Sequence, residues 1–205
     1  MHPNPAFRPH QSPDADRALM RALIDEIGFG MVFAATTDGP RVAHVPLLLT
    51  SAGTIKFHLA RGNALARHIA GKDILAVING PDGYVSPRWY ADSAQVPTWN
   101  YVSLELEGPV QRMDSDGLLG LLDALSTQHE ARLQHGTPWT MDKVPETDLR
   151  RMLSAIIGFE LEVKGWRPTF KLSQNKPVEE RERVIAGLET AGSLGIAQLM
   201  RDLTP

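Results

Sequence analysis

The chain has 205 residues, a size that supports one well-buried core and is short for two full domains. Its 24 acidic and 21 basic residues give a formal charge of −3, which counts against a protein held on nucleic acid by a global positive field. Cysteine is absent and no apolar run approaches the roughly 18 residues that span a bilayer, so disulfides, thiolate catalysis, Cys-ligated metals and a membrane span are excluded.

The first predicted elements are an arm, a helix and an antiparallel meander. Residues 1–11 are proline-rich and predict a flexible arm without the features of a secretion signal, so we expect a cytoplasmic protein. A capping serine and a proline at 12–13 begin an amphipathic helix that Gly28 ends. The β-rich runs that follow are separated by turn residues, and they predict strands over 29–37, 42–50 and 54–59.

The rest of the chain mixes strands and helices without a regular βαβ repeat. This pattern predicts a mainly β, α+β fold: a closed antiparallel sheet with peripheral helices over 12–176, and a helical extension of the same domain over 177–205. Up to residue 100 we expect a short helix at 63–70, a strand at 74–79, a turn at Gly80-Pro81-Asp82-Gly83, a resumed strand at 84–85 and an ordered loop at 86–100. A strand at 101–113, a helix capped by Asp114, a helix at 145–153 and a strand at 156–164 follow. The chain then continues with a polar loop or strand end at 170–176 and a charged helix opened by Pro177.

The end of the strand at 54–59 has the features of an anion site. Arg61 and Asn63 stand where a strand leads into a helix, and the free N–H groups and dipole of a helix start attract phosphate. The alternative is that Arg61 is solvated and Asn63 only caps the helix. His44, on a neighbouring strand interrupted by a proline, is a further candidate contact, although a lone strand histidine is more often an ordinary core or surface residue.

Aromatic side chains gather in the loop at 86–100. Such a concentration suits a planar ring that is stacked at its faces and hydrogen-bonded at its edges, and the alternative is an aromatic plug or a dimer interface. The candidate contacts in and beside this loop are Ser86, Trp89, Thr98, Trp99 and Asn100.

A polar segment near the C-terminus completes the candidate residues. Lys171 and Gln174 can reach an anionic or amide edge of a ligand, while Ser173 or Asn175 can instead cap the helix after Pro177. The charged run at 179–183 predicts a solvated helical face. No cluster has metal-ligand spacing, and no nucleophile elbow, P-loop or dinucleotide fingerprint is present, so no catalytic residue is assigned.

Six motifs follow one another in the chain: His44-Val45-Pro46-Leu47-Leu48, His58-x-Ala60-Arg61-x-Asn63, Val85-Ser86-Pro87-x-Trp89-Tyr90, Val96-Pro97-Thr98-Trp99-Asn100-Tyr101, Ile157-Gly158-Phe159-Glu160 and Phe170-Lys171-Leu172-Ser173-Gln174-Asn175. Together, over roughly residues 14–190, they resemble the PaiB-like family of FMN-binding negative transcriptional regulators. One departure from the family pattern is Ala64, where a proline is usual.

The resemblance implies an FMN-binding split β-barrel of the antiparallel Greek-key type, with FMN between the two chains of a homodimer. By position it places Arg61, Asn63 and His44 at the FMN phosphate. It also implies transcriptional regulation, with DNA contacted directly or indirectly; the sequence shows no helix-turn-helix and no basic face. The competing hypothesis is a small flavin-dependent oxidoreductase, in which the flavin carries the chemistry, and a third is a haem-handling split barrel.

Overall fold

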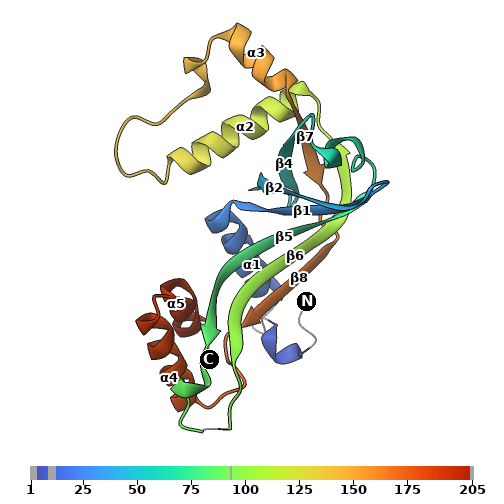
Figure 1. The fold of residues 1–205 in the computed structure, drawn as a ribbon. Coiled ribbons are helices and arrows are strands. Elements are labelled where there is room, and N and C mark those ends of the chain that lie inside the picture. The colour runs from blue at the N-terminus through green and yellow to red at the C-terminus, as the bar shows by residue number, and fades with distance from the viewer. Residues whose placement is uncertain (1–3, 9–12, 93, 204–205) are drawn as a thin grey trace. The chain divides into compact units, whose positions relative to one another are not determined.

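The computed structural model describes residues 4–8, 13–92 and 94–203 (Figure 1). The chain forms two compact units, and each is described here by itself. The first unit comprises Met1–Met20, Asn79–Leu104 and Arg167–Pro205, and the second comprises Arg21–Ile78 and Glu105–Trp166.

The strands of the described residues form an eight-stranded antiparallel sheet in the order β2-β1-β5-β6-β7-β4-β3, with β8 paired to β6. This confirms the predicted fold class, an antiparallel α+β fold of the split-barrel kind. The strands are β1 (Phe29–Thr36), β2 (Gly39–Pro46), β3 (Leu48–Leu49), β4 (Ile55–Ala60), β5 (Asp73–Val85), β6 (Thr98–Arg112), β7 (Ile156–Leu161) and β8 (Gly165–Lys171).

Several helices begin or end at residues that the sequence predicts, and the predicted cap Ser12 lies outside the described residues. Asp114 accepts a hydrogen bond from the backbone N–H of Gly117 and so begins α2, as predicted. No helix in the described ranges is long and apolar enough to cross a membrane. The α-helices are α1 (Pro13–Ile27), α2 (Ser115–Glu130), α3 (Glu146–Ser154), α4 (Val178–Thr190) and α5 (Leu194–Asp202), and the 3-10 helices are η1 (Pro5–Phe7), η2 (Ala64–Arg67), η3 (Pro87–Trp89) and η4 (Met141–Lys143).

The core of the second unit is built from alternating residues of β4 and β7. Phe57 is paired in register with Phe159, and their rings stack with centroids 5.6 Å apart. Both side chains are fully buried, together with Ile55 and Leu161 at the next inward positions. Because side chains alternate across a strand, His58 and Lys56 lie on the opposite face of β4.

The predicted turn at Gly80-Pro81-Asp82-Gly83 is wrong, because β5 continues through these residues. Both glycines have extended backbone and serve close packing within the first unit. A Cβ on Gly80 would lie 3.0 Å from Cβ of Val102, and one on Gly83 would lie 2.7 Å from Cδ2 of Leu188. Glycine in a strand can mark a close approach of neighbouring atoms instead of a turn.

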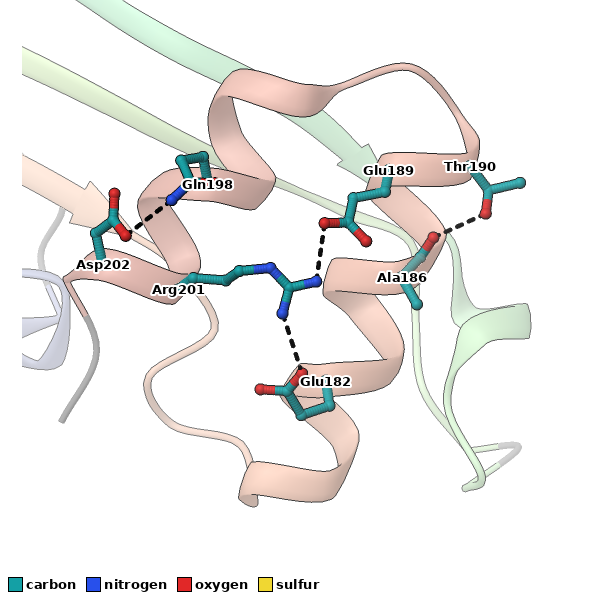
Figure 2. Close-up of polar contacts among 7 residues, drawn as sticks. All are labelled: Glu182, Ala186, Glu189, Thr190, Gln198, Arg201 and Asp202. Carbon is teal, nitrogen blue, oxygen red and sulfur yellow. Dashed lines mark hydrogen bonds and ion pairs between the residues drawn. The ribbon is translucent and has the colours of Figure 1, made fainter.

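The single predicted C-terminal helix is in fact two, α4 and α5. The chain reverses at Gly192, whose φ of 81° lies in the left-handed region that favours glycine. Figure 2 shows Arg201 of α5 between Glu182 and Glu189 of α4, with nitrogen–oxygen distances of 3.5 and 2.8 Å. Part of the charged run at 179–183 is therefore engaged between helices, and Arg181 within it is buried.

The predicted domain boundaries at 1–11, 12–176 and 177–205 stay a prediction. Residues 1–3 and 9–11 of the predicted arm lie outside the described residues. Within residues 4–8, Asn4 caps the short helix η1, and the side chain of Phe7 is buried in the first unit.

Candidate functional site

The second unit contains a hollow of about 330 Å³ that is lined by three arginines. Arg61 follows β4, Arg112 ends β6, and Arg150 lies in α3. Ser115 and the capping residue Asp114 bring the start of α2 to the same wall. Guanidinium groups and a helix start favour an anion, since both present N–H donors.

Arg61 is held at this hollow by the C-terminal end of α3. Its backbone N–H donates to the carbonyl of Ala155 at 2.8 Å, and its Nε donates to the carbonyl of Ser154 at 2.8 Å. A cation at this position is favoured by the free carbonyls and the negative end of the helix dipole. Arg61 Nη2 also donates to the carbonyl of Ile156 at 3.5 Å. A guanidinium carries five N–H donors, so these two bonds do not use all of them.

Arg112 and Arg150 are not among the residues predicted from the sequence. Arg150 forms an ion pair of 2.6 Å with Glu146 one turn away on α3, and both side chains are largely exposed. A signal for Arg112 does exist in the sequence, because it stands at a strand end just before the helix capped by Asp114. This is the same strand-to-helix pattern that singles out Arg61.

Asn63 and His44 do not line this hollow. Asn63 Oδ1 accepts a hydrogen bond of 2.9 Å from the backbone N–H of Leu65, which confirms that Asn63 caps the helix η2. His44 is exposed on β2, opposite Met31 of β1. Strand β2 contacts η2 in the second unit, so these two residues belong to neighbouring elements.

His58 lies on β4, three residues before Arg61 and opposite Gly158 of β7, which lines the hollow. Burial lowers the pKa of His58, because desolvation disfavours the charged imidazole. Its Nδ1 has no hydrogen-bond partner among the described residues. The neutral form of His58 is therefore the stable one in the folded chain.

The first unit contains a second hollow, of about 300 Å³, that brings together three of the predicted contacts: Thr98, Asn100 and Lys171. They are joined there by residues that the sequence did not single out, Tyr90 and Lys176. A shared segment is the signal that was available for Lys176, because it ends the polar segment at 170–176 that contains Lys171. The complete lining is Asn4, Phe7, Tyr90, Gln95, Val96, Thr98, Asn100, Lys171, Ser173, Asn175 and Lys176.

A buried hydrogen-bond network forms one wall of this hollow. Asn100 Nδ2 donates to Ser173 Oγ at 3.0 Å, and Tyr90 is hydrogen-bonded to Ser173 as well. Burial raises the pKa of Tyr90, an effect that the bond to Ser173 opposes and the nearby Glu180 carboxylate reinforces. Ser173 has a φ of 60°, a left-handed conformation that is uncommon for residues other than glycine.

Two lysines line the same hollow. Lys171 Nζ donates to Thr98 Oγ1 at 2.5 Å and lies 5.8 Å from the ring centroid of Phe7. Lys176 Nζ donates to Gln95 Oε1 at 2.6 Å and lies 5.4 Å from the ring centroid of Tyr90. Burial lowers the pKa of Lys171. Both ammonium groups are therefore held by neutral partners.

Four other predicted contacts lie in the first unit but outside this hollow: Ser86, Trp89, Trp99 and Gln174. Ser86 caps η3 through the backbone N–H of Arg88, and both polar atoms of Gln174 bond its own loop, at Phe170 O and Leu172 N. Ser86 and Gln174 therefore shape loops of the first unit. Asn175, which lines the hollow, does not cap α4, because α4 begins after Pro177 without a side-chain cap.

The two tryptophans among the predicted contacts differ in burial. Trp89 packs against Gly187 of α4, where a Cβ would lie 2.2 Å from Trp89 Cδ2. Trp99 is 53% exposed and meets Tyr84 edge to face with centroids 5.0 Å apart. Trp99 also lines a hollow of about 280 Å³ with Asn79, Gly80, Asp82, Tyr101 and Val102. It is the predicted aromatic contact with a ring face open to a ligand or another chain.

Within the second unit, the arginine hollow fits the phosphate of a flavin mononucleotide, because it supplies three cationic side chains. Within the first unit, Trp99 is an exposed aromatic side chain of the kind that stacks on a planar ring. Among the described residues, no three His, Asp or Glu side chains cluster closely enough to hold a metal ion.

Comparisons with known proteins point to the same cofactor. Residues 1–165 match the family model described as "Putative FMN-binding domain". The chain is 30% identical over 187 residues to the Protease synthase and sporulation protein PAI 2 of Bacillus subtilis, covering 88% of this chain and 89% of that one.

Solved structures support the fold. The FAD and haem binding protein of Mycobacterium smegmatis superposes with a TM-score of 0.59 at 21% identity, over 83% of this chain and 78% of that one. The flavocytochrome Anf3 of Azotobacter vinelandii superposes with a TM-score of 0.54 at 18% identity, over 80% and 73% of the two chains. At these identities the likeness concerns the fold alone.

Proposed function

This chain belongs to the FMN-binding domain family, and from that membership we propose that it is a PaiB-like regulator that binds FMN at a homodimer interface in the cytoplasm. The observation that carries the proposal is the hollow in the second unit, where Arg61 meets Arg112 and Arg150. When bound, FMN supplies redox chemistry or a redox-sensitive signal, and the protein supplies binding and orientation.

The phosphate of FMN is the group that this hollow suits best. A phosphate carries close to two negative charges, and guanidinium groups bind it through paired hydrogen bonds. Arg61 keeps free N–H donors while the end of α3 holds it in place. His44 and Asn63 lie on the neighbouring elements β2 and η2, and we place them as secondary contacts, with Asn63 fixing the start of η2.

The flavin ring is assigned to the aromatic residues of the predicted set. Trp99 offers an exposed face, and Trp89 is fixed against α4. Ser86 and Gln174 support these loops through their own hydrogen bonds. These residues line the flavin or the facing subunit of the proposed dimer. Thr98, Asn100 and Lys171 line a hollow of their own in the first unit.

A regulatory role is supported by the similarity to a Bacillus protein whose name refers to protease synthesis and sporulation. The formal charge of −3 disfavours broad electrostatic contact with DNA. Regulation then acts on a specific operator or through a partner, with the flavin reporting the redox or ligand state.

The test is a titration of the purified protein with FMN, followed by absorbance and by quenching of flavin fluorescence. We expect saturable binding at one site per chain and a dimer in sedimentation at micromolar concentration. Absence of FMN binding would contradict the proposal, and so would a monomer with FMN bound. Steady oxidation of NADH or NADPH by the FMN-loaded protein, without operator binding, would replace the regulator by an oxidoreductase, and a Soret band after reconstitution would indicate haem.

A further inference from the structure

Within the described residues, the hollow of the first unit is lined by positively charged side chains and by no negatively charged one. Lys171 and Lys176 both line it, and none of its described lining residues has a carboxylate. Each amine bonds one neutral oxygen, of Thr98 or Gln95. Among the described residues, neither lysine forms an ion pair with a carboxylate.

The nearest acidic groups stay outside the lining of the hollow. Asp92 is fully exposed, accepts a hydrogen bond of 2.7 Å from Gln95 Nε2 and interacts electrostatically with Lys176 without lining the cavity. Glu180 accepts from the backbone N–H of Ala91 instead of entering the hollow. Two half-buried ammonium groups therefore share one cavity without an anion of the protein, an arrangement that costs free energy unless a ligand compensates for it.

The walls between the lysines are prepared for a polar ligand. Asn100 and Ser173 are buried and hydrogen-bonded to one another, and Tyr90 joins them through its hydroxyl. The left-handed backbone of Ser173 is held in place by Gln174, which bonds the carbonyl of Phe170 and the N–H of Leu172. Strained backbone that is held by its surroundings is typical of ligand clamps.

Size and lining define the class of ligand. A volume of about 300 Å³ is at the lower end for small-molecule sites. Phe7 and Val96 add an apolar side to a cavity that otherwise presents ammonium, hydroxyl and amide groups. We propose that this hollow binds a small organic anion, held through its carboxylate or phosphate groups by Lys171 and Lys176 and oriented by Thr98 and Asn100.

This inference stands apart from the proposed function, because all the lining residues belong to the first unit and none is needed at the arginine hollow of the second unit. It assigns Lys171, Thr98 and Asn100 to a second ligand instead of the flavin. The anion can be a substrate or an effector, and the test measures its binding.

The test uses isothermal titration calorimetry of the full chain, with and without saturating FMN, against succinate, citrate and pyrophosphate at matched ionic strength. We expect at least one of these anions to bind at one site per chain. The double variant K171M/K176M should raise its dissociation constant about tenfold or more, because each lost bond to a charged group weakens binding substantially. The matched double variant K72M/K143M removes two lysines outside the hollow and should leave the dissociation constant unchanged.

A second measurement needs no variant. Bound anion should protect Lys171 and Lys176 of the wild-type protein from acetic anhydride, detected by peptide mass spectrometry, while exposed Lys72 keeps its labelling rate. Absence of heat and of protection for all three anions would overturn the inference. So would anion binding that survives in K171M/K176M. Weakened FMN binding in that variant, without loss of anion binding, would assign the hollow to the flavin.

Discussion

Asn100 and Ser173, which lie 73 positions apart in the chain, are joined by a fully buried pair of hydrogen bonds. Asn100 Nδ2 donates to Ser173 Oγ at 3.0 Å, and Ser173 Oγ donates to Asn100 Oδ1 at 3.2 Å. The pair connects the start of β6 to the turn after β8, and it places the hydroxyl of Ser173 beside Tyr90. The shape of the hollow in the first unit therefore depends on this pair.

Removing either partner should destabilise the protein. We expect Asn100→Ala and Ser173→Ala each to lower the free energy of unfolding by about 1–3 kcal/mol, since each leaves a buried polar group without its partner. The double variant should lose less free energy of unfolding than the sum of the two single losses. In urea denaturation we expect the difference, which is the coupling energy of the pair, to be about 0.5–3 kcal/mol. Additive losses would mean that the two side chains do not depend on one another.

Glycine-to-alanine substitutions in α4 and in α2 should change the stability of the protein in opposite directions, because only the glycine in α4 is in close contact with another side chain. Gly187→Ala should destabilise the protein by about 1–3 kcal/mol, because the new Cβ would lie 2.2 Å from Trp89 Cδ2. Gly120→Ala in α2 meets no atom within 4 Å and should stabilise by about 0.5–1 kcal/mol. The measurement is thermal unfolding of both variants and the wild type, with tryptophan emission reporting on the surroundings of Trp89. A neutral Gly187→Ala would show that Trp89 moves without cost.

Arg61 should contribute strongly to FMN binding. Arg61→Ala is expected to weaken binding by about 1.5–3 kcal/mol, the range for a hydrogen bond to a charged group, or about 10- to 150-fold in the dissociation constant. The measurement is a fluorescence titration with FMN. Exposed Arg183 on α4 provides the control, and Arg183→Ala should bind FMN as the wild type does. An unchanged dissociation constant for Arg61→Ala removes this residue from the phosphate site.

Arg112 should act at the same phosphate, because it lines the same hollow from the end of β6. We expect Arg112→Ala to weaken binding of FMN, while binding of riboflavin, which lacks the phosphate, stays unchanged. Equal losses for the two ligands would point to a contact with the ring. If Arg112→Ala binds both ligands as the wild type does, the phosphate lies outside the arginine hollow.

His58 predicts a pH dependence of stability. Burial lowers the pKa of its imidazole in the folded chain, while the unfolded chain takes up the proton near pH 6.5. Below that pH the unfolded state binds more protons, so the free energy of unfolding falls as the pH falls, until the folded state is protonated too. Above that pH both states are neutral and the effect vanishes.

The measurement is urea denaturation from about pH 7.5 down to about pH 5.5, the range over which histidine titrates. His58→Gln should lose less stability over this range than the wild type. The same substitution at exposed His44 serves as the control and should keep the wild-type slope. Equal slopes for His58→Gln and the wild type would mean that protonation of His58 costs nothing in the folded chain.

Local signals in the sequence located many of the elements. Gly28 ends α1 with a φ of 61°, Asp114 caps α2 and Asn63 caps η2, each at the predicted position. The β-rich pattern also predicted strands at 54–59 and 156–164, where β4 and β7 are found. Caps and periodicity act over a few residues, so they can be recognised without knowledge of the tertiary contacts.

The prediction of a turn at Gly80–Gly83 was wrong because glycine and proline occur in strands as well as in turns. They allow tight turns, and they also allow neighbouring atoms to approach an extended strand. Val102 and Leu188 provide those neighbours here, from positions far along the chain. The strand β8 was missed for a related reason, since it depends on pairing with the distant strand β6. The division between α4 and α5 had a local signal, Gly192, which the prediction did not use.

The sequence by itself determined the antiparallel α+β fold, the family and its FMN cofactor, because strand alternation, capping residues and the ordered motifs are all written in short stretches of chain. Only the tertiary structure decided which charged groups share a cavity. Arg112 and Arg150 join Arg61, and Tyr90 joins Lys171, through contacts between segments that are far apart in the chain. The charge of a site is the sum over all the elements that surround it, and no local pattern contains that sum.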